Sequence, residues 1–171
     1  KEKGVNEYVQ AAKILKKKYK NTEFVILGGV DEQNPGGLST GDLNRLIDEG
    51  VWIYPGHVSD VQTWIASASV FVLPSYREGL PRSTQEAMAV GRAIITTDVP
   101  GCRETVIDGE NGFLIPVRSV DALVEAMEKF VVDLNLIQIM GSRSRQMAEF
   151  KYDVHQINRT MMQQMGITIN D

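Results

Sequence analysis

Two glutamates, Glu78 and Glu86, stand eight residues apart on either side of Pro81. Proline is favoured where a helix begins, so a helix is expected to start at this point. Its first amides, those of Arg82 and Ser83, would lie at the positive end of the helix dipole and could bind a diphosphate. Glu86 lies about one turn into this helix, where its carboxylate could accept hydrogen bonds from a ribose diol. Glu78 could reach another part of the same ligand.

Two other interpretations of this glutamate pair stay open on chemistry alone. A solvated glutamate near a helix N-terminus is favourable without any ligand, because it complements the helix dipole. A glycoside hydrolase also uses two carboxyl groups, set about 5 to 9 Å apart across an open cleft. The sequence shows no second carbohydrate-binding surface that would support this activity.

The elements that must position these residues are short apolar runs that alternate with amphipathic segments. Apolar runs bounded by Gly or Pro are typical of strands buried on both faces of a parallel sheet. The predicted strands cover residues 24–27, 51–54, 70–73, 93–96 and 112–115. The predicted helices cover residues 5–19, 41–49, 60–67 and 82–90, a long segment capped by Ser119, and most of 134–165. The alternation predicts an α/β fold with a doubly wound parallel sheet, which binds ligands at the carboxyl ends of its strands.

The composition excludes several classes of function. The 171 residues suffice for one domain with a hydrophobic core, and the net charge of −4 argues against a dedicated nucleic-acid binder. Cys102 is the single cysteine, which excludes an internal disulfide and a cysteine zinc site. His57 and His155 are the only histidines, so a histidine metal cluster is not expected. The apolar runs are far shorter than the roughly 20 residues of a membrane-spanning helix.

Other nucleotide-binding folds need motifs that this chain lacks. A nicotinamide-binding domain needs Gly-x-Gly-x-x-Gly after its first strand, and Gly28-Gly29-Val30 does not supply it. The P-loop motif is absent as well. A phospho-receiver domain needs an aspartate at the end of a strand, whereas the third strand ends in Pro74-Ser75.

Residues 74–91 carry the most specific pattern of the chain, Pro-Ser-Tyr-Arg-Glu-Gly-Leu-Pro-Arg-Ser-Thr-Gln-Glu-Ala-Met-Ala-Val-Gly. This segment resembles the signature of the retaining GT-B glycosyltransferases of family four. Residues 56–60, 97–104 and 108–114 resemble further segments of the same family, in the same order. The resemblance covers about residues 1–130, and the final helices are not diagnostic.

The resemblance implies a domain assignment. Residues 1–171 would be the C-terminal domain, which binds the nucleotide-sugar donor, and the N-terminal acceptor-binding domain would be absent. Lys3-Gly4 resembles the end of a motif in which an arginine shortly precedes the lysine. That arginine and the first strand of the sheet would lie before residue 1. In the family a terminal helix crosses back to the other domain, so exposed apolar residues are expected near the C-terminus.

For the donor sugar, the resemblance implies that Glu78 holds its hydroxyl groups, beside the backbone of Gly79 and Leu80. Glu78 and Lys3 are the residues assigned to catalysis. The implied reaction transfers the sugar with retention of configuration, and negative charge builds on the leaving diphosphate. Positive groups fixed near that charge would stabilise the transition state.

For the nucleotide, the resemblance implies that Lys3 and the amides of Arg82 and Ser83 bind the diphosphate. Glu86 would bind the ribose hydroxyls, and the backbone of Val58 would lie against the base. No metal or other cofactor is expected, because these groups would supply the positive charge and the sequence has no Asp-x-Asp pair.

The expected partners follow from the same resemblance. The loop with Asn34-Pro35 and the Pro-Gly-Cys-Arg-Glu run resemble bacterial enzymes of capsule, O-antigen and lipid-linked glycan synthesis. A UDP-hexose or UDP-N-acetylhexosamine donor is therefore expected, with a saccharide or lipid-linked acceptor on the absent domain. A cytoplasmic location is expected, and peripheral association of the full-length protein with the inner face of the plasma membrane is allowed. The alternative is a non-catalytic, nucleotide-sensing module on the same fold, and this fragment alone is expected to be inactive.

Overall fold

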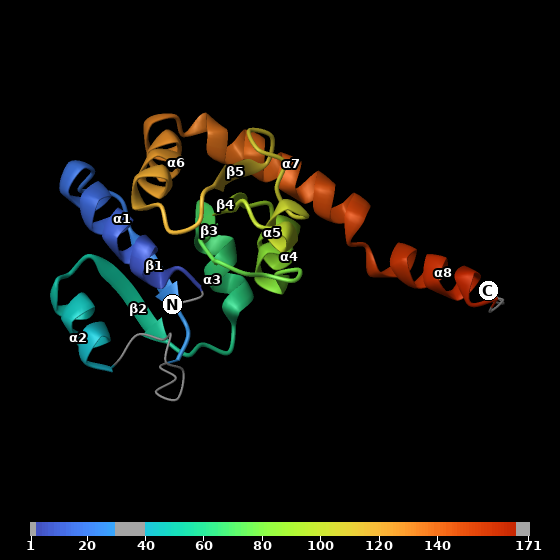
Figure 1. The fold of residues 1–171 in the computed structure, drawn as a ribbon, viewed down its shortest axis with the longest axis horizontal. Helices are drawn as coiled ribbons and strands as arrows, with labels where there is room; N and C mark the ends of the chain where they lie inside the picture. The colour runs from blue at the N-terminus through green and yellow to red at the C-terminus, as the bar shows by residue number, and fades with distance from the viewer. Residues whose placement is uncertain (1–2, 30–39, 167–171) are drawn as a thin grey trace.

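The computed structural model describes residues 3–29 and 40–166, so the loop with Asn34 and Pro35 lies outside the described residues. Helices and strands alternate along the chain, which confirms the predicted α/β class (Figure 1). The strands are β1 (Phe24–Leu27), β2 (Trp52–Gly56), β3 (Val70–Leu73), β4 (Ala93–Thr97) and β5 (Gly112–Ile115). The helices are α1 (Val5–Lys18), α2 (Thr40–Asp48), α3 (Val61–Ser67), α4 (Arg82–Ala89), α5 (Pro100–Arg103), α6 (Val120–Val132), α7 (Asn135–Lys151) and α8 (Val154–Gln164).

The strands are parallel, as predicted, but in the described part of the chain they form two sheets. β1 pairs with β2, and β3, β4 and β5 form the second sheet in that order. A cavity of about 820 Å³ opens between β1 and β3, with Phe24 and Val25 on one side and Val70 and Val72 on the other. The doubly wound sheet is therefore interrupted between these two strands.

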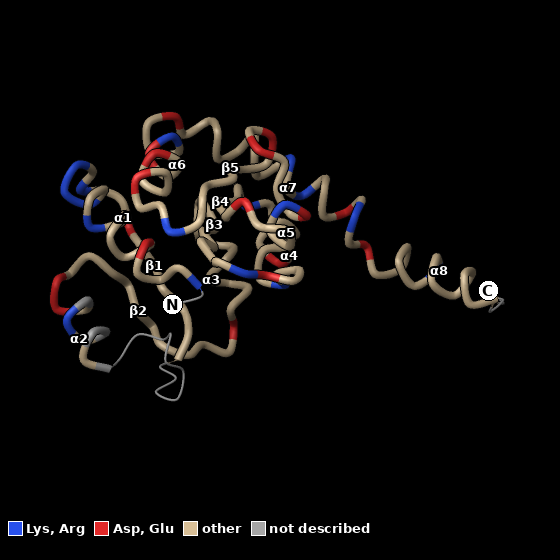
Figure 2. Tube along the Cα trace, in the orientation of Figure 1, with Lys and Arg blue, Asp and Glu red and all other residues tan. Residues whose placement is uncertain are grey.

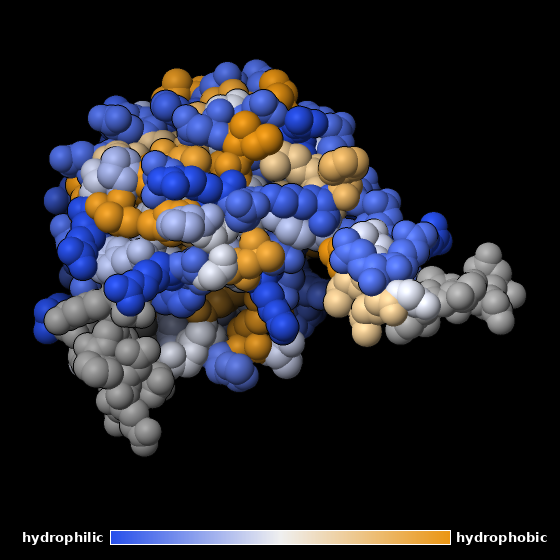
Figure 3. Space-filling view, turned by 45° about the vertical axis from the view of Figure 1, so that its right-hand side comes forward, coloured by the Kyte–Doolittle hydropathy of each residue, from blue (hydrophilic) through white to orange (hydrophobic). Residues whose placement is uncertain are grey.

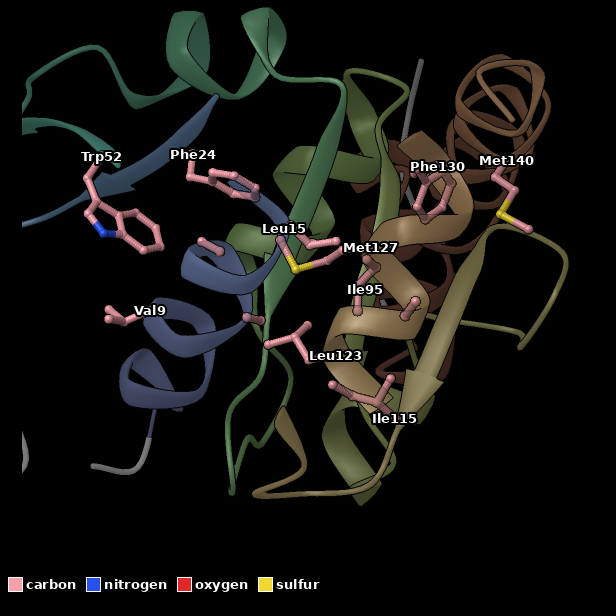
Figure 4. Close-up of a cluster of buried hydrophobic side chains, with 14 residues drawn as sticks. Val9, Leu15, Phe24, Trp52, Ile95, Ile115, Leu123, Met127, Phe130 and Met140 are labelled. Carbon is pink, nitrogen blue, oxygen red and sulfur yellow. The ribbon is translucent and has the colours of Figure 1, made fainter. Parts of the chain in front are cut away.

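Helices cover both faces of the larger sheet. α1 packs on α6, while α4 packs on α3 and α7 (Figure 1). Successive side chains of a strand point to opposite faces, so neighbouring residues of β4 join different clusters. Ile95 packs in the cluster with α1 and α6, and Ile94 packs in the cluster with α4 and α7. Figure 4 shows the first cluster, where Leu15, Leu123 and Met127 lie near Ile95.

Two local differences from the predicted elements have physical causes. β2 extends through Pro55 and Gly56, where the sequence predicted its end. Its only partner among the described strands is β1, and a proline is tolerated in a strand with one paired edge. The short helix α5 replaces a predicted loop, because Pro100 can occupy the first position of a helix.

The C-terminal helices behave differently from each other. α7 packs closely on the main body, since Gly141 lies against the carbonyl of Gly91 without a side chain between them. α8 buries no residue and extends away from the body (Figure 1). Most of its apolar side chains, Met161 among them, are exposed, as expected, and so is Met165 directly after the helix; Figure 3 shows apolar atoms on this projecting segment. Among the described residues, no helix has both the length and the apolar character that a bilayer span requires.

Candidate functional site

The first turn of α4 has the geometry that the sequence predicted. Pro81 precedes the helix with extended backbone angles, φ −70° and ψ 113°, and Gln85 N donates to Pro81 O over 3.3 Å. No side chain caps this helix start. The amides of exposed Arg82 and half-buried Ser83 therefore remain available to an anion at the positive end of the helix dipole.

Glu78 is brought together with Lys3, although 75 positions separate them in the sequence. The Lys3 ammonium donates to Glu78 Oε1 over 2.6 Å, and the two side chains are 64% and 11% exposed. The carboxylate is thus mostly shielded, while the cation reaches solvent. Both residues assigned to catalysis lie at one place, and Lys3 has a carboxylate partner that the sequence did not predict for it.

The backbone of the segment before α4 rests on α5. A Cβ atom on Gly101 would overlap the carbonyl groups of Glu78 and Gly79, so only glycine allows this approach. Gly101 and Cys102 are buried, whereas Gly79 and Leu80 are exposed. Gly79 and Leu80 follow Glu78 directly and are exposed, and their assignment to the donor sugar stays a prediction. The support from α5 was not predicted, although the Pro-Gly dipeptide at 100–101 marks a special backbone.

Tyr76 is a further residue of this segment that the sequence analysis did not single out. Its hydroxyl donates to Glu7 Oε1 of α1 over 2.5 Å, and the Arg118 guanidinium lies 4.8 Å from the ring centroid. The hydrogen bond to Glu7 raises the pKa of Tyr76, burial and the Glu7 charge add to this effect, and Arg118 opposes it. We call Glu7, Tyr76 and Arg118 the Tyr76 cluster.

Val58 follows β2 and Glu86 lies within α4, and neither makes a hydrogen bond or ion pair to Lys3 or Glu78 in the described residues. α1 begins near the end of β3, where Gly4 lies against the Pro74 carbonyl. The helix then runs away from this edge, and the chain returns to it along β1. β1 and β3 therefore end at one edge, and half-buried Val58 follows β2 there. Figure 2 shows acidic and basic segments alternating near the start of α4, where Glu86 is exposed.

The described residues contain no group of three His, Cys, Asp or Glu side chains placed to hold a metal ion. One carboxylate at this edge, Asp98, accepts a hydrogen bond from Arg103 Nε over 2.5 Å. This bond lowers the pKa of Asp98. The pair lies on the segment between β4 and the end of α5, and both side chains are exposed.

With this geometry in view, the comparison with known families is informative. The model of the family described as "Glycosyl transferases group 1" matches residues 1–147. The chain belongs to this family. It is 32% identical over 152 residues to the capsular polysaccharide biosynthesis glycosyltransferase CapM of Staphylococcus aureus, which covers 89% of the chain and 40% of that protein.

A second relative comes from Campylobacter jejuni, the N,N'-diacetylbacillosaminyl-diphospho-undecaprenol alpha-1,3-N-acetylgalactosaminyltransferase. It is 35% identical over 151 residues, 88% of the chain and 38% of that protein. Among solved structures, sucrose-phosphate synthase from Thermosynechococcus elongatus aligns with a TM-score of 0.82 at 26% identity, over 96% of this chain and 42% of that one. The chain thus spans about two fifths of the curated relatives it matches, and its fold is that of GT-B glycosyltransferases.

Proposed function

We propose that this chain is the C-terminal, donor-binding domain of a retaining glycosyltransferase. One observation carries the proposal: Lys3 and Glu78 meet at the carboxyl edge of the strands, on the segment that leads into the uncapped start of α4. This edge is where α/β sheets bind ligands. Membership of the group 1 family supports a transferase, and the domain boundary and site are our assignments.

In this proposal each group of the site has one task. Glu78, with the backbone of Gly79 and Leu80, binds hydroxyl groups of the donor sugar. The amides of Arg82 and Ser83 bind the diphosphate, and Lys3 moves from the Glu78 carboxylate to share it. A lysine with a flexible, 64% exposed side chain can make that exchange at small cost. As the bond from sugar to phosphate breaks, these positive groups stabilise the charge that develops on the leaving diphosphate.

The nucleotide end of the donor is assigned to Glu86 and Val58. Glu86 is exposed, and its carboxylate is free of hydrogen bonds and ion pairs from the described residues, so it can accept both hydroxyls of a ribose. Val58 follows Gly56, whose carbonyl accepts a hydrogen bond from Gly28 N over 3.0 Å. This bond holds the end of β2, two residues before Val58, against the end of β1, and we assign the base to this place.

We further propose a UDP-N-acetylhexosamine or UDP-hexose donor and a saccharide or lipid-linked acceptor in bacterial polysaccharide synthesis. The Campylobacter relative is named for N-acetylgalactosamine transfer to a lipid-linked sugar, and the Staphylococcus relative for capsule synthesis. The acceptor would bind a second domain of a longer protein. No metal is assigned to the reaction, because Lys3 and the start of α4 supply positive charge.

The cavity between β1 and β3 supports the view that a strand of the longer protein belongs here. Both strands present an edge that has no strand partner among the described residues, and apolar side chains line the space between them. Lys3 and Gly4 lie at the carboxyl end of β3, where a parallel strand placed in this cavity would end. We propose that such a strand precedes α1 and completes the sheet.

A calorimetric titration with UDP, GDP and ADP, without added metal, tests the function. We expect UDP to bind most tightly, with NMR shifts at Val58, Arg82 and Glu86. Glu86→Ala should weaken UDP binding by about tenfold or more, because two hydrogen bonds to a charged group are lost.

Glu125→Ala on the exposed face of α6 is the matched control and should bind UDP as the wild type does. If Glu86→Ala also binds as the wild type does, Glu86 is not part of the site. If neither this chain nor a longer one with the preceding strand binds any of the three nucleotides, the proposed function is wrong.

A further inference from the structure

The segment between β3 and α4 has no backbone hydrogen bonds of its own. Residues 75–80 are all described, and none of their amides or carbonyls bonds to the backbone of another described residue. One side chain bonds to this backbone, since Thr97 Oγ1 donates to the Ser75 carbonyl. The position of Glu78 therefore depends on side-chain contacts and on the packing of its backbone against Gly101, rather than on a turn or ladder.

Two of these contacts come from the start of α1. Lys3 binds Glu78 over 2.6 Å, and Glu7, four residues later, binds the Tyr76 hydroxyl over 2.5 Å. Lys3 precedes α1 and Glu7 lies in its first turn, so the start of α1 and the residue before its N-cap hold the segment at two points. Arg118, from the connection between β5 and α6, covers the ring of Tyr76. The segment is thus fixed from two elements that are distant in sequence.

Two features of the Tyr76 cluster are unfavourable in isolation. Glu7 Oε2 is buried and has no hydrogen-bond partner in the part of the chain that the structure describes, and a buried carboxylate oxygen without a partner is costly. Arg118 has a φ of 60°, a left-handed conformation that residues other than glycine rarely adopt. The two residues that carry these features, Glu7 and Arg118, both contact Tyr76. We therefore link both features to the position of the Tyr76 side chain.

We infer that Tyr76 is a positioning residue, which Glu7 and Arg118 hold so that the Glu78 carboxylate faces the donor sugar. The inference rests on the proposed function. Tyr76 acts through Glu78, since its hydroxyl is engaged with Glu7. Removing the phenol hydroxyl should therefore reduce binding of the sugar and leave the binding of the nucleotide to α4 unchanged.

The first test needs no ligand. ¹⁵N relaxation would give order parameters for the amides of residues 77–80 in the wild type and in Tyr76→Phe, Glu7→Ala and Glu7→Gln. We expect values of about 0.85 in the wild type and below about 0.6 in Tyr76→Phe and Glu7→Ala. Glu7→Gln keeps a carbonyl oxygen that accepts the phenol hydrogen, so it should retain the wild-type values.

Tyr19→Phe is the matched control for these variants. The Tyr19 hydroxyl also donates to a glutamate, Glu128 Oε1, over 2.7 Å, but at the other end of α1. The control should leave the order parameters of residues 77–80 unchanged. Unchanged order parameters in Tyr76→Phe, or a loss of order in Tyr19→Phe as large as in Tyr76→Phe, would overturn the inference whatever the ligand results are.

The second test compares UDP with UDP-N-acetylglucosamine and UDP-glucose by calorimetry. For the sugar nucleotide that the wild type prefers, Tyr76→Phe and Glu7→Ala should lose about fivefold or more in affinity, while UDP affinity changes by less than about twofold. Glu7→Gln should keep the wild-type ratio of sugar-nucleotide affinity to UDP affinity. An equal loss for UDP and the sugar nucleotide would show that Tyr76 stabilises the whole domain and would reject the positioning role. Absence of UDP, GDP and ADP binding both in this chain and in a longer one with the preceding strand would refute the proposed function instead, and the order parameters would still decide how Tyr76 acts.

Discussion

α1 carries a tyrosine–glutamate hydrogen bond near each of its ends, and the two bonds serve different purposes. At the carboxyl edge of the strands, Glu7 of α1 accepts from Tyr76. At the opposite end, Tyr19 donates to Glu128 of α6 over 2.7 Å, and Lys18 donates to the same carboxylate oxygen over 2.5 Å. Figure 2 shows that this end of α1 is basic. We call Lys18, Tyr19 and Glu128 the Tyr19 cluster.

The difference between the two clusters lies in what they connect. The Tyr19 cluster joins two helices that already share a buried apolar core, with Leu15 of α1 and Leu123 of α6 in the same cluster. The Tyr76 cluster joins a helix to a segment without backbone hydrogen bonds of its own. We therefore expect the bond to matter less for geometry at the Tyr19 end of α1 than at the Tyr76 end, where it acts together with the packing of the segment on Gly101. Two hydrogen bonds of the same chemistry can differ in their effect on the structure, because the packing around each bond determines how much depends on it.

The largest effect on the carboxyl edge is expected from Gly101→Ala. The added methyl group would overlap the carbonyls of Glu78 and Gly79, which are backbone atoms that cannot rotate away. We expect a loss of about 1–3 kcal/mol in the free energy of unfolding, measured in urea, and loss of sugar-nucleotide binding. Gly29→Ala is the control, because the nearest atom to its new methyl group would be His57 Cβ at 4.0 Å. Equal behaviour of the two variants would show that α5 does not support the Glu78 segment.

The sequence predicted the parts of this edge that depend on local patterns. Pro81 and the residues after it determine where α4 begins. A run of four or five apolar residues predicts a buried strand, whichever strand it pairs with. The Tyr76 cluster could not be predicted in this way, since 69 positions separate Glu7 from Tyr76 and either residue alone is typical of a surface. They come together because the start of α1, at Gly4, lies against Pro74 at the end of β3.

The interruption of the sheet was also beyond local patterns. β1 and β3 have the apolar composition of central strands, and that composition is the same whether an edge is paired or free. α5 was missed because a Pro-Gly pair indicates a turn as readily as a short helix. For α5 the deciding contact comes from another part of the chain, the backbone of Glu78 and Gly79.

A rise in pH is expected to have an intermediate effect on the stability of the protein. This effect distinguishes the Tyr76 cluster from the Tyr19 cluster. The hydrogen bond to Glu7 raises the pKa of Tyr76 above its ordinary value of about 10. A raised pKa means that the folded protein binds this proton more tightly than the unfolded chain does. The stabilisation is therefore complete below about pH 10 and is lost as the pH rises through the pKa of Tyr76 in the folded protein.

NMR titration of the Tyr76 ring carbons measures this pKa directly. Glu7→Ala should lower the midpoint toward 10, while Arg118 on the other side of the ring continues to favour the phenolate. Glu128→Ala removes the matching carboxylate at the far end of α1 and should leave the midpoint of Tyr76 unchanged. A midpoint that stays in place in Glu7→Ala would mean that burial, rather than this hydrogen bond, controls the proton.

The smallest effect on stability, and the sharpest contrast between the two ends of α1, is expected from two lysine variants. Lys3 and Lys18 each bind one glutamate, Glu78 and Glu128, and their side chains are 64% and 63% exposed. Exposed ion pairs contribute little to stability, so Lys3→Ala should change the free energy of unfolding by less than about 0.5 kcal/mol. UDP affinity should nevertheless fall in Lys3→Ala, because a positive charge near the diphosphate is lost, and remain unchanged in Lys18→Ala. Equal UDP affinity in both variants would remove Lys3 from the donor site and leave its bond to Glu78 as a surface ion pair like that of Lys18.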